Sequence, residues 1–216
     1  MQPIEYQECP ELKGVYLSPS FVWGNNMHTV GIFCGSSEGL SPVYMESASF
    51  VGKWLAENGI GIVYGGGRVG LMGAVADSAL AHGGHVTGII PKSLLEREIA
   101  HTGLSDLQVV DNMHQRKNRM AELSSSFIAL PGGAGTAEEI FEQWTWAQLG
   151  IHNKPCAFMN INHFYDPLRV MVQQMVSEGF MKQGYADMLL FSEELPEIIE
   201  YFKAYTPPVS KWTTQS

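Results

Sequence analysis

Short apolar runs alternate with stretches of helical spacing over most of this chain, and this alternation constrains its fold more than any other feature. The expected strands are 29–34, 60–64, 85–90, 107–110, 127–130, 155–159 and 188–191. The expected helices are 42–58, 71–82, 114–124, 136–149, 164–178 and 195–205. Strands that are apolar throughout and separated by helices are typical of a mainly parallel sheet that is covered on both faces. The sequence therefore predicts an α/β protein with a Rossmann-like, doubly wound sheet.

Three of the expected strands end in loops rich in glycine or serine. These loops are Gly35–Gly39, Gly65–Gly70 and Pro131–Gly135. Parallel strands end at the same edge of a sheet, and open α/β sheets bind ligands beyond that edge at a topological switch point. We therefore expect all three loops to lie near a ligand site.

The loop Pro131–Gly135 joins a strand to a helix and is the clearest candidate for a phosphate site. Its glycines leave backbone N–H groups unshielded at a helix N-terminus, where the helix dipole favours an anion. Glu139 follows within about one helical turn, and phosphate binding alone does not call for an acid there. A second interpretation is a capping box, with Thr136 as the N-cap and Glu139 reaching back to it. We favour a catalytic site over the capping box.

The segment Gly65-x-Gly67-x-x-Gly70 resembles a dinucleotide-binding fingerprint. That interpretation needs an acidic residue at the end of the next strand to bind the ribose. The next strand ends Ile89-Ile90-Pro91-Lys92 and supplies no acid. No Gly-Lys-Ser or Gly-Lys-Thr follows either glycine loop, so neither is a Walker A loop. The pattern favours a nucleotide pocket without a dinucleotide.

The segment 114–119 contains Arg116, Lys117 and Arg119 and is the most cationic part of an acidic chain. It could be only the solvated face of a helix. However, its helix directly precedes the strand that leads to Pro131–Gly135. A planar guanidinium also suits the recognition of phosphate oxygens. We therefore expect Arg116 to contact a substrate.

Composition limits the possible functions further. The net charge of −9 over 216 residues argues against nucleic acid as a partner. No apolar run is long enough to span a membrane. Cys9, Cys34 and Cys156 are far apart, a pattern typical of a reducing, cytoplasmic compartment. The histidines form no metal-ligand pattern. We expect a domain at 28–205, an extension of unknown role at 1–27 and a tail at 206–216.

Several motifs together resemble the LONELY GUY (LOG) family of cytokinin riboside 5′-monophosphate phosphoribohydrolases. They lie within 28–205: Phe33-Cys34-Gly35-Ser36-Ser37, Gly65-Gly66-Gly67-x-x-Gly70-Leu71-Met72-Gly73, Met113-His114-x-Arg116-Lys117-x-x-Met120, Pro131-Gly132-Gly133-x-Gly135-Thr136-x-x-Glu139 and Trp146-Ala147-Gln148-Leu149-Gly150-Ile151-His152-x-Lys154-Pro155. The resemblance implies a Rossmann-like homodimer that needs no cofactor. It also implies release of an adenine-type base and ribose 5-phosphate from the nucleotide.

The family's catalytic arginine and glutamate correspond to Arg116 and Glu139. The residues that we expect to bind an AMP-like substrate are Ser36, Ser37, Gly66, Gly67, Met113, Lys117, Gly132, Gly133, Gly135 and Thr136. Cleavage of an N-glycosidic bond passes through a ribosyl cation, which a carboxylate can stabilise while it orients or deprotonates water. The alternative is a carrier that holds a nucleotide or cofactor in the same pocket without catalysis.

Overall fold

The computed structural model describes residues 29–95 and 100–208 and contains a seven-stranded parallel sheet. The strands are β1 (Thr29–Phe33), β2 (Gly61–Tyr64), β3 (Val86–Pro91), β4 (Asp106–Val110), β5 (Ser126–Ala129), β6 (Cys156–Met159) and β7 (Leu189–Ser192). Their order across the sheet is β4-β3-β2-β1-β5-β6-β7. The chain therefore winds outward from β1 to β4 and returns to β5 on the other side of β1. This confirms the predicted Rossmann-like fold and places the switch point between β1 and β5.

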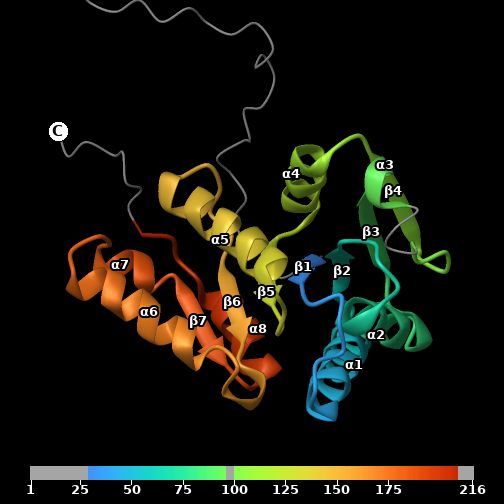
Figure 1. Ribbon diagram of the computed structural model, residues 1–216, viewed down its shortest axis with the longest axis horizontal. Helices are drawn as coiled ribbons and strands as arrows, with labels where there is room; N and C mark the ends of the chain where they lie inside the picture. The colour runs from blue at the N-terminus through green and yellow to red at the C-terminus, as the bar shows by residue number, and fades with distance from the viewer. Residues whose placement is uncertain (1–28, 96–99, 209–216) are drawn as a thin grey trace, which may run out of the picture.

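Helices cover both faces of the sheet (Figure 1). They are α1 (Pro42–Glu57), α2 (Gly70–Ala81), α3 (Lys92–Leu95), α4 (Met113–Leu123), α5 (Ala134–Leu149), the 3-10 turn η2 (Ile161–His163), α6 (Asp166–Ser177), α7 (Gln183–Ala186) and α8 (Leu195–Ala204). The short helices α3 and α7 were not expected, because four residues are too few to show helical periodicity. The extension 1–27, Cys9 and most of the tail 206–216 lie outside the described residues.

The hydrophobic core has two layers, one on each face of the sheet. Helices α1, α2 and α8 pack on one face, around buried residues such as Ile62 and Phe202. Helices α4 to α7 pack on the other, around residues such as Phe127 and Phe158. The central strands β1, β2, β5 and β6 are buried almost throughout, whereas the edge strand β4 is only partly buried. This burial explains why the central strands are continuous apolar runs in the sequence.

Candidate active site

The three glycine- or serine-rich loops meet at the carboxyl edge of the sheet, as the sequence predicts. The Gly35 amide, just after β1, donates to the Pro131 carbonyl, just after β5, at 3.0 Å. The Gly35 carbonyl accepts from the Leu71 amide of α2 at 3.1 Å. The loop after β1 therefore contacts both the loop after β5 and the start of α2, directly beside the switch point.

Helix α5 begins at Ala134, with Gly133 as its N-cap and no side chain capping it. The alternative capping-box interpretation does not hold in the structure, because Thr136 lies inside the first turn and Glu139 lies in the second. The first turn contains no acidic residue, and Gly133, Ala134 and Gly135 are exposed to solvent. An uncapped helix N-terminus presents free N–H groups and a positive dipole end, so this turn can accept a phosphate.

Helix α4 begins differently, because nearby side chains accept hydrogen bonds from backbone N–H groups at its N-terminus. The Asn112 side chain accepts from the Gln115 amide at 3.0 Å. The Gln115 side chain in turn accepts from the Asp111 amide at 2.8 Å. This reciprocal arrangement resembles a capping box, except that the second bond reaches the amide of the residue before the N-cap. It fixes the first turn of α4 and thereby positions the next two residues, Arg116 and Lys117.

Arg116 is buried, with only 7% of its side chain exposed, so it does not belong to a solvated helix face. Its Nη1 lies 3.8 Å from Met113 Sδ, and its buried Nε has no hydrogen-bond partner. A guanidinium carries five N–H donors, and leaving them unsatisfied in a buried position is costly. The guanidinium therefore has an unused N–H donor at Nε.

Gly65 provides the space that Arg116 occupies. A Cβ atom at Gly65 would lie 2.0 Å from Arg116 Nη2, far inside contact distance. Any larger residue at the end of β2 would therefore displace the guanidinium. Gly65 is not among the site residues expected from the sequence. The only available signal was its place as the first of three consecutive glycines, which does not show which of them faces the site.

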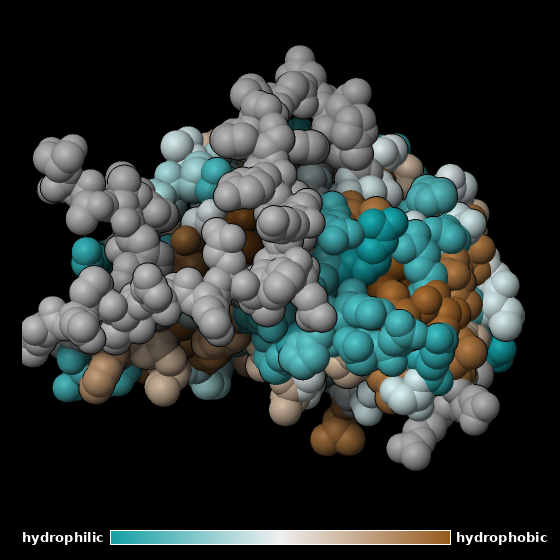
Figure 2. Space-filling view, turned by 90° about the horizontal axis from the view of Figure 1, so that it is seen from above, coloured by the Kyte–Doolittle hydropathy of each residue, from teal (hydrophilic) through white to brown (hydrophobic). Residues whose placement is uncertain are grey.

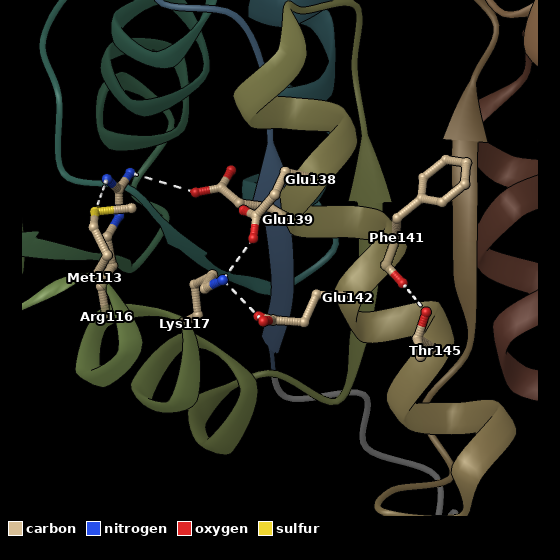
Figure 3. Close-up of polar contacts among 8 residues, drawn as sticks. All are labelled: Met113, Arg116, Lys117, Glu138, Glu139, Phe141, Glu142 and Thr145. Atoms are coloured by element: carbon tan, nitrogen blue, oxygen red, sulfur yellow. Dashed lines mark hydrogen bonds and ion pairs between the residues drawn. The ribbon is translucent and has the colours of Figure 1, made fainter.

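Glu139 faces Arg116 across the gap between α5 and α4 (Figure 3). Its Oε1 lies 3.7 Å from Arg116 Nη2, and 13% of its side chain is exposed. Burial and the negative charge of Glu139 together raise the pKa of the Cys34 thiol, so that thiol stays protonated. The structure thus brings together Arg116 and Glu139, which are 23 positions apart in the sequence, with both side chains largely buried.

Lys117, which is expected to bind substrate, contacts two carboxylates of α5. Its Nζ lies 2.6 Å from Glu138 Oε1 and 2.8 Å from Glu142 Oε1. Burial alone would lower the pKa of Lys117, but hydrogen bonds and charge interactions with the two glutamates outweigh burial and raise it. Lys117 therefore remains charged at neutral pH.

The other expected site residues occupy different positions around this pair. Ser36 and Ser37 are exposed in the β1 loop, and Met113 is exposed beside Arg116. Gly66 and Gly67 are buried in a turn that faces 100–101, where the Gly66 carbonyl accepts from the His101 amide. Over the described ranges 29–95 and 100–208, no cluster of histidine, cysteine and acidic side chains could hold a metal ion.

The fold and these contacts define a Rossmann-like α/β protein with a paired arginine and glutamate at the switch point. A family model described as "Possible lysine decarboxylase" matches residues 72–202. A cytokinin riboside 5′-monophosphate phosphoribohydrolase from Rhodococcoides fascians is 50% identical over 168 residues, which are 77% of this chain and 85% of that protein. The LOG phosphoribohydrolase of Oryza sativa subsp. japonica is 43% identical over 82% of this chain and 73% of its own length. The chain belongs to the LOG family.

Solved structures with lower sequence identity share the fold. A molybdenum cofactor binding protein from Rippkaea orientalis superposes with a TM-score of 0.62 at 19% identity, over 84% of this chain and 98% of that one. The molybdenum cofactor carrier protein of Chlamydomonas reinhardtii also gives a TM-score of 0.62, at 17% identity, over 83% of this chain and 100% of that one. At such identities the likeness establishes the fold alone.

Proposed function

We propose that this chain hydrolyses the N-glycosidic bond of purine nucleoside 5′-monophosphates of the cytokinin type, such as AMP and N6-prenylated AMP. The products are a free base and ribose 5-phosphate, and the reaction uses no cofactor. The observation that carries the proposal is the buried Arg116, whose Nε has no partner and which faces Glu139 at 3.7 Å. The family membership and the uncapped N-terminus of α5 support it.

The phosphate would bind to the backbone N–H groups at the start of α5, in the loop 132–136. Gly133 and Gly135 have no atoms within 4 Å of the place where a Cβ would stand, so phosphate oxygens could approach the backbone there. Gly132 instead packs against the Thr136 side chain and fixes the shape of the turn. Because the phosphate is remote from the bond that breaks, its binding energy can position the ribose for the reaction.

Glu139 would act at C1′ of the ribose, one helical turn from the phosphate. As the bond from C1′ to the base nitrogen breaks, a carboxylate can stabilise the positive charge that develops on the sugar. It can also take a proton from the attacking water, and this proton balances the one that the departing base gains. Arg116 would hold the sugar or phosphate by charge-assisted hydrogen bonds and keep the Glu139 carboxylate oriented.

Product analysis distinguishes this hydrolase from a carrier. Purified protein is incubated with AMP, N6-prenylated AMP and adenosine, and free base and ribose 5-phosphate are measured by chromatography. We expect release of base from both nucleotides and little from adenosine, which lacks the phosphate. Tight binding of AMP without release would support the carrier interpretation instead. Equal kcat/KM for AMP and adenosine would contradict a site built around the phosphate.

We further propose that the protein is a cytoplasmic homodimer. Buried free cysteines at 34 and 156 support a reducing compartment. No described helix has the length and apolar character needed to cross a membrane. Trp144 does not contribute to such an interface, because it is buried and donates its indole N–H to the Tyr185 carbonyl.

Exposed apolar residues such as Val170, Met171 and Phe180 support contacts between copies. The view from above also shows apolar side chains at the surface among hydrophilic ones (Figure 2). Light scattering at micromolar concentration tests the dimer, and a monomeric mass would contradict it.

A further inference from the structure

Lys117 lies between two carboxylates of the neighbouring helix, directly beside the Arg116–Glu139 pair (Figure 3). Its side chain is 10% exposed, whereas those of Glu138 and Glu142 are 54% and 22% exposed. The two glutamates are four residues apart on α5, so they lie on the same face of that helix. One ammonium group therefore links α4 to two successive turns of α5.

The geometry points to Lys117 as a positioning residue for the Arg116–Glu139 pair, an inference that rests on the proposed hydrolase function. Lys117 follows Arg116 on α4, and Glu138 precedes Glu139 on α5. A shift of α4 relative to α5 that broke the contacts of Lys117 would also change the 3.7 Å separation of Arg116 and Glu139. Lys117 thus fixes the distance between the two groups that act on the substrate.

The charges of the same cluster support this role. Three carboxylates, of Glu138, Glu139 and Glu142, lie within the first three turns of α5. Without Lys117, Glu138 and Glu142 would repel each other, and both would oppose an incoming phosphate. With Lys117 between them, the first turn of α5 keeps its preference for an anion. Two of the three N–H donors of Lys117 are already used on these carboxylates, which argues against direct substrate binding.

Arg119 provides a matched control on the same helix. Its Nη1 contacts Glu122 at 2.9 Å, but the two side chains are 41% and 52% exposed and both belong to α4. This ion pair does not connect α4 to α5. Removing the charge of Arg119 therefore tests whether any loss of charge on α4 has the same effect as the loss of Lys117.

The test compares Lys117→Met, Lys117→Arg and Arg119→Met by kcat and KM for AMP, with thermal unfolding measured in parallel. We expect kcat of Lys117→Met to fall roughly tenfold or more, because small misplacements of reacting groups are costly. KM should change little, Lys117→Arg should recover much of the rate, and Arg119→Met should behave as the wild type. Lys117→Met combined with Glu142→Gln should lose less than the product of the two single losses.

A raised KM with unchanged kcat in Lys117→Met would assign Lys117 to substrate binding and overturn the inference. Normal kcat in a merely less stable variant would reduce Lys117 to a structural role and overturn it as well. Crystal structures of the wild type and Lys117→Met add a readout independent of turnover. We expect the Arg116–Glu139 separation to widen, and an unchanged separation contradicts the inference.

A wild type that releases no base from AMP refutes the proposed function, while this structural comparison still tests Lys117. If Lys117→Met does not fold, Glu142→Gln and Lys117→Arg provide the same comparison.

Discussion

The loops Gly65–Gly70 and Pro131–Gly135 look alike in the sequence, but the structure uses them in opposite ways. Each follows a buried strand, contains three or more glycines and leads into a helix. At the start of α2, a Cβ on Gly70 would lie 2.4 Å from the Ser36 carbonyl carbon, so this loop is closed by the β1 loop. At the start of α5, Gly133 and Gly135 face open space. A glycine run can thus serve close packing or ligand access, and only the neighbouring backbone distinguishes them.

The largest expected effect tests whether the helix that follows the open loop Pro131–Gly135 carries a reactive acid. Glu139→Gln preserves the size of the side chain and one acceptor oxygen, but it replaces the other oxygen with an NH2 donor and removes the negative charge. We expect a folded protein that binds AMP and turns over roughly 10²-fold more slowly or worse, the scale of a lost acid–base group. The measurement is kcat with AMP, with Glu122→Gln on α4 as the control. Retained turnover would show that Glu139 is not the catalytic acid–base group and that another carboxylate has this role.

The next prediction concerns the closed loop. Gly70 has φ +58, and its added Cβ would meet the Ser36 backbone. Gly70→Ala should therefore lower the free energy of unfolding by about 2 kcal/mol, the scale of a strained left-handed residue. Urea denaturation measures this loss, and Gly135→Ala is the matched control at the open loop. Equal stability losses in the two variants would remove the distinction between the loops.

The sequence predicted the fold more completely than the site. Continuous apolar strands and helical spacing indicate the sheet, because burial on both faces dictates that pattern directly. The pairing of Arg116 with Glu139 followed from the expectation that their elements share one sheet edge. Burial of Arg116 and the contacts of Lys117 could not be predicted, because both depend on how far apart α4 and α5 lie. Thr136-x-x-Glu139 fits the capping-box motif, yet the helix capped by a side chain is α4 and not α5, because α5 begins two residues before Thr136.

A smaller effect tests the one place where the closed loop contributes to the site. Gly65→Ala places a Cβ 2.0 Å from Arg116 Nη2, and the guanidinium is the mobile end of a long side chain. We expect the side chain to move and kcat/KM for AMP to fall about tenfold, the loss of one charge-assisted hydrogen bond. Arg116→Ala should give a similar loss. Arg116→Lys should not restore activity fully, because an ammonium lacks the planar fork. Normal activity in Gly65→Ala would show that the position of the guanidinium does not matter.

The smallest expected effect separates phosphate access from stability at the open loop. Gly135→Ala introduces a methyl group where no atom lies within 4 Å, so the fold accepts it without strain. Stability should stay the same or rise by about 0.5 kcal/mol, because alanine restricts the unfolded chain more than glycine does. The methyl group would nevertheless narrow the approach of phosphate oxygens to the N–H groups of the first turn. We therefore expect KM for AMP to rise by a factor of about three, with kcat nearly unchanged. This loss of binding is smaller than the loss of one hydrogen bond to a charged group.

Steady-state kinetics with AMP and adenosine provide the measurement, since adenosine has no phosphate to exclude. A proportional rise in KM for both substrates would show that the methyl group disturbs the ribose or base and that the phosphate binds elsewhere.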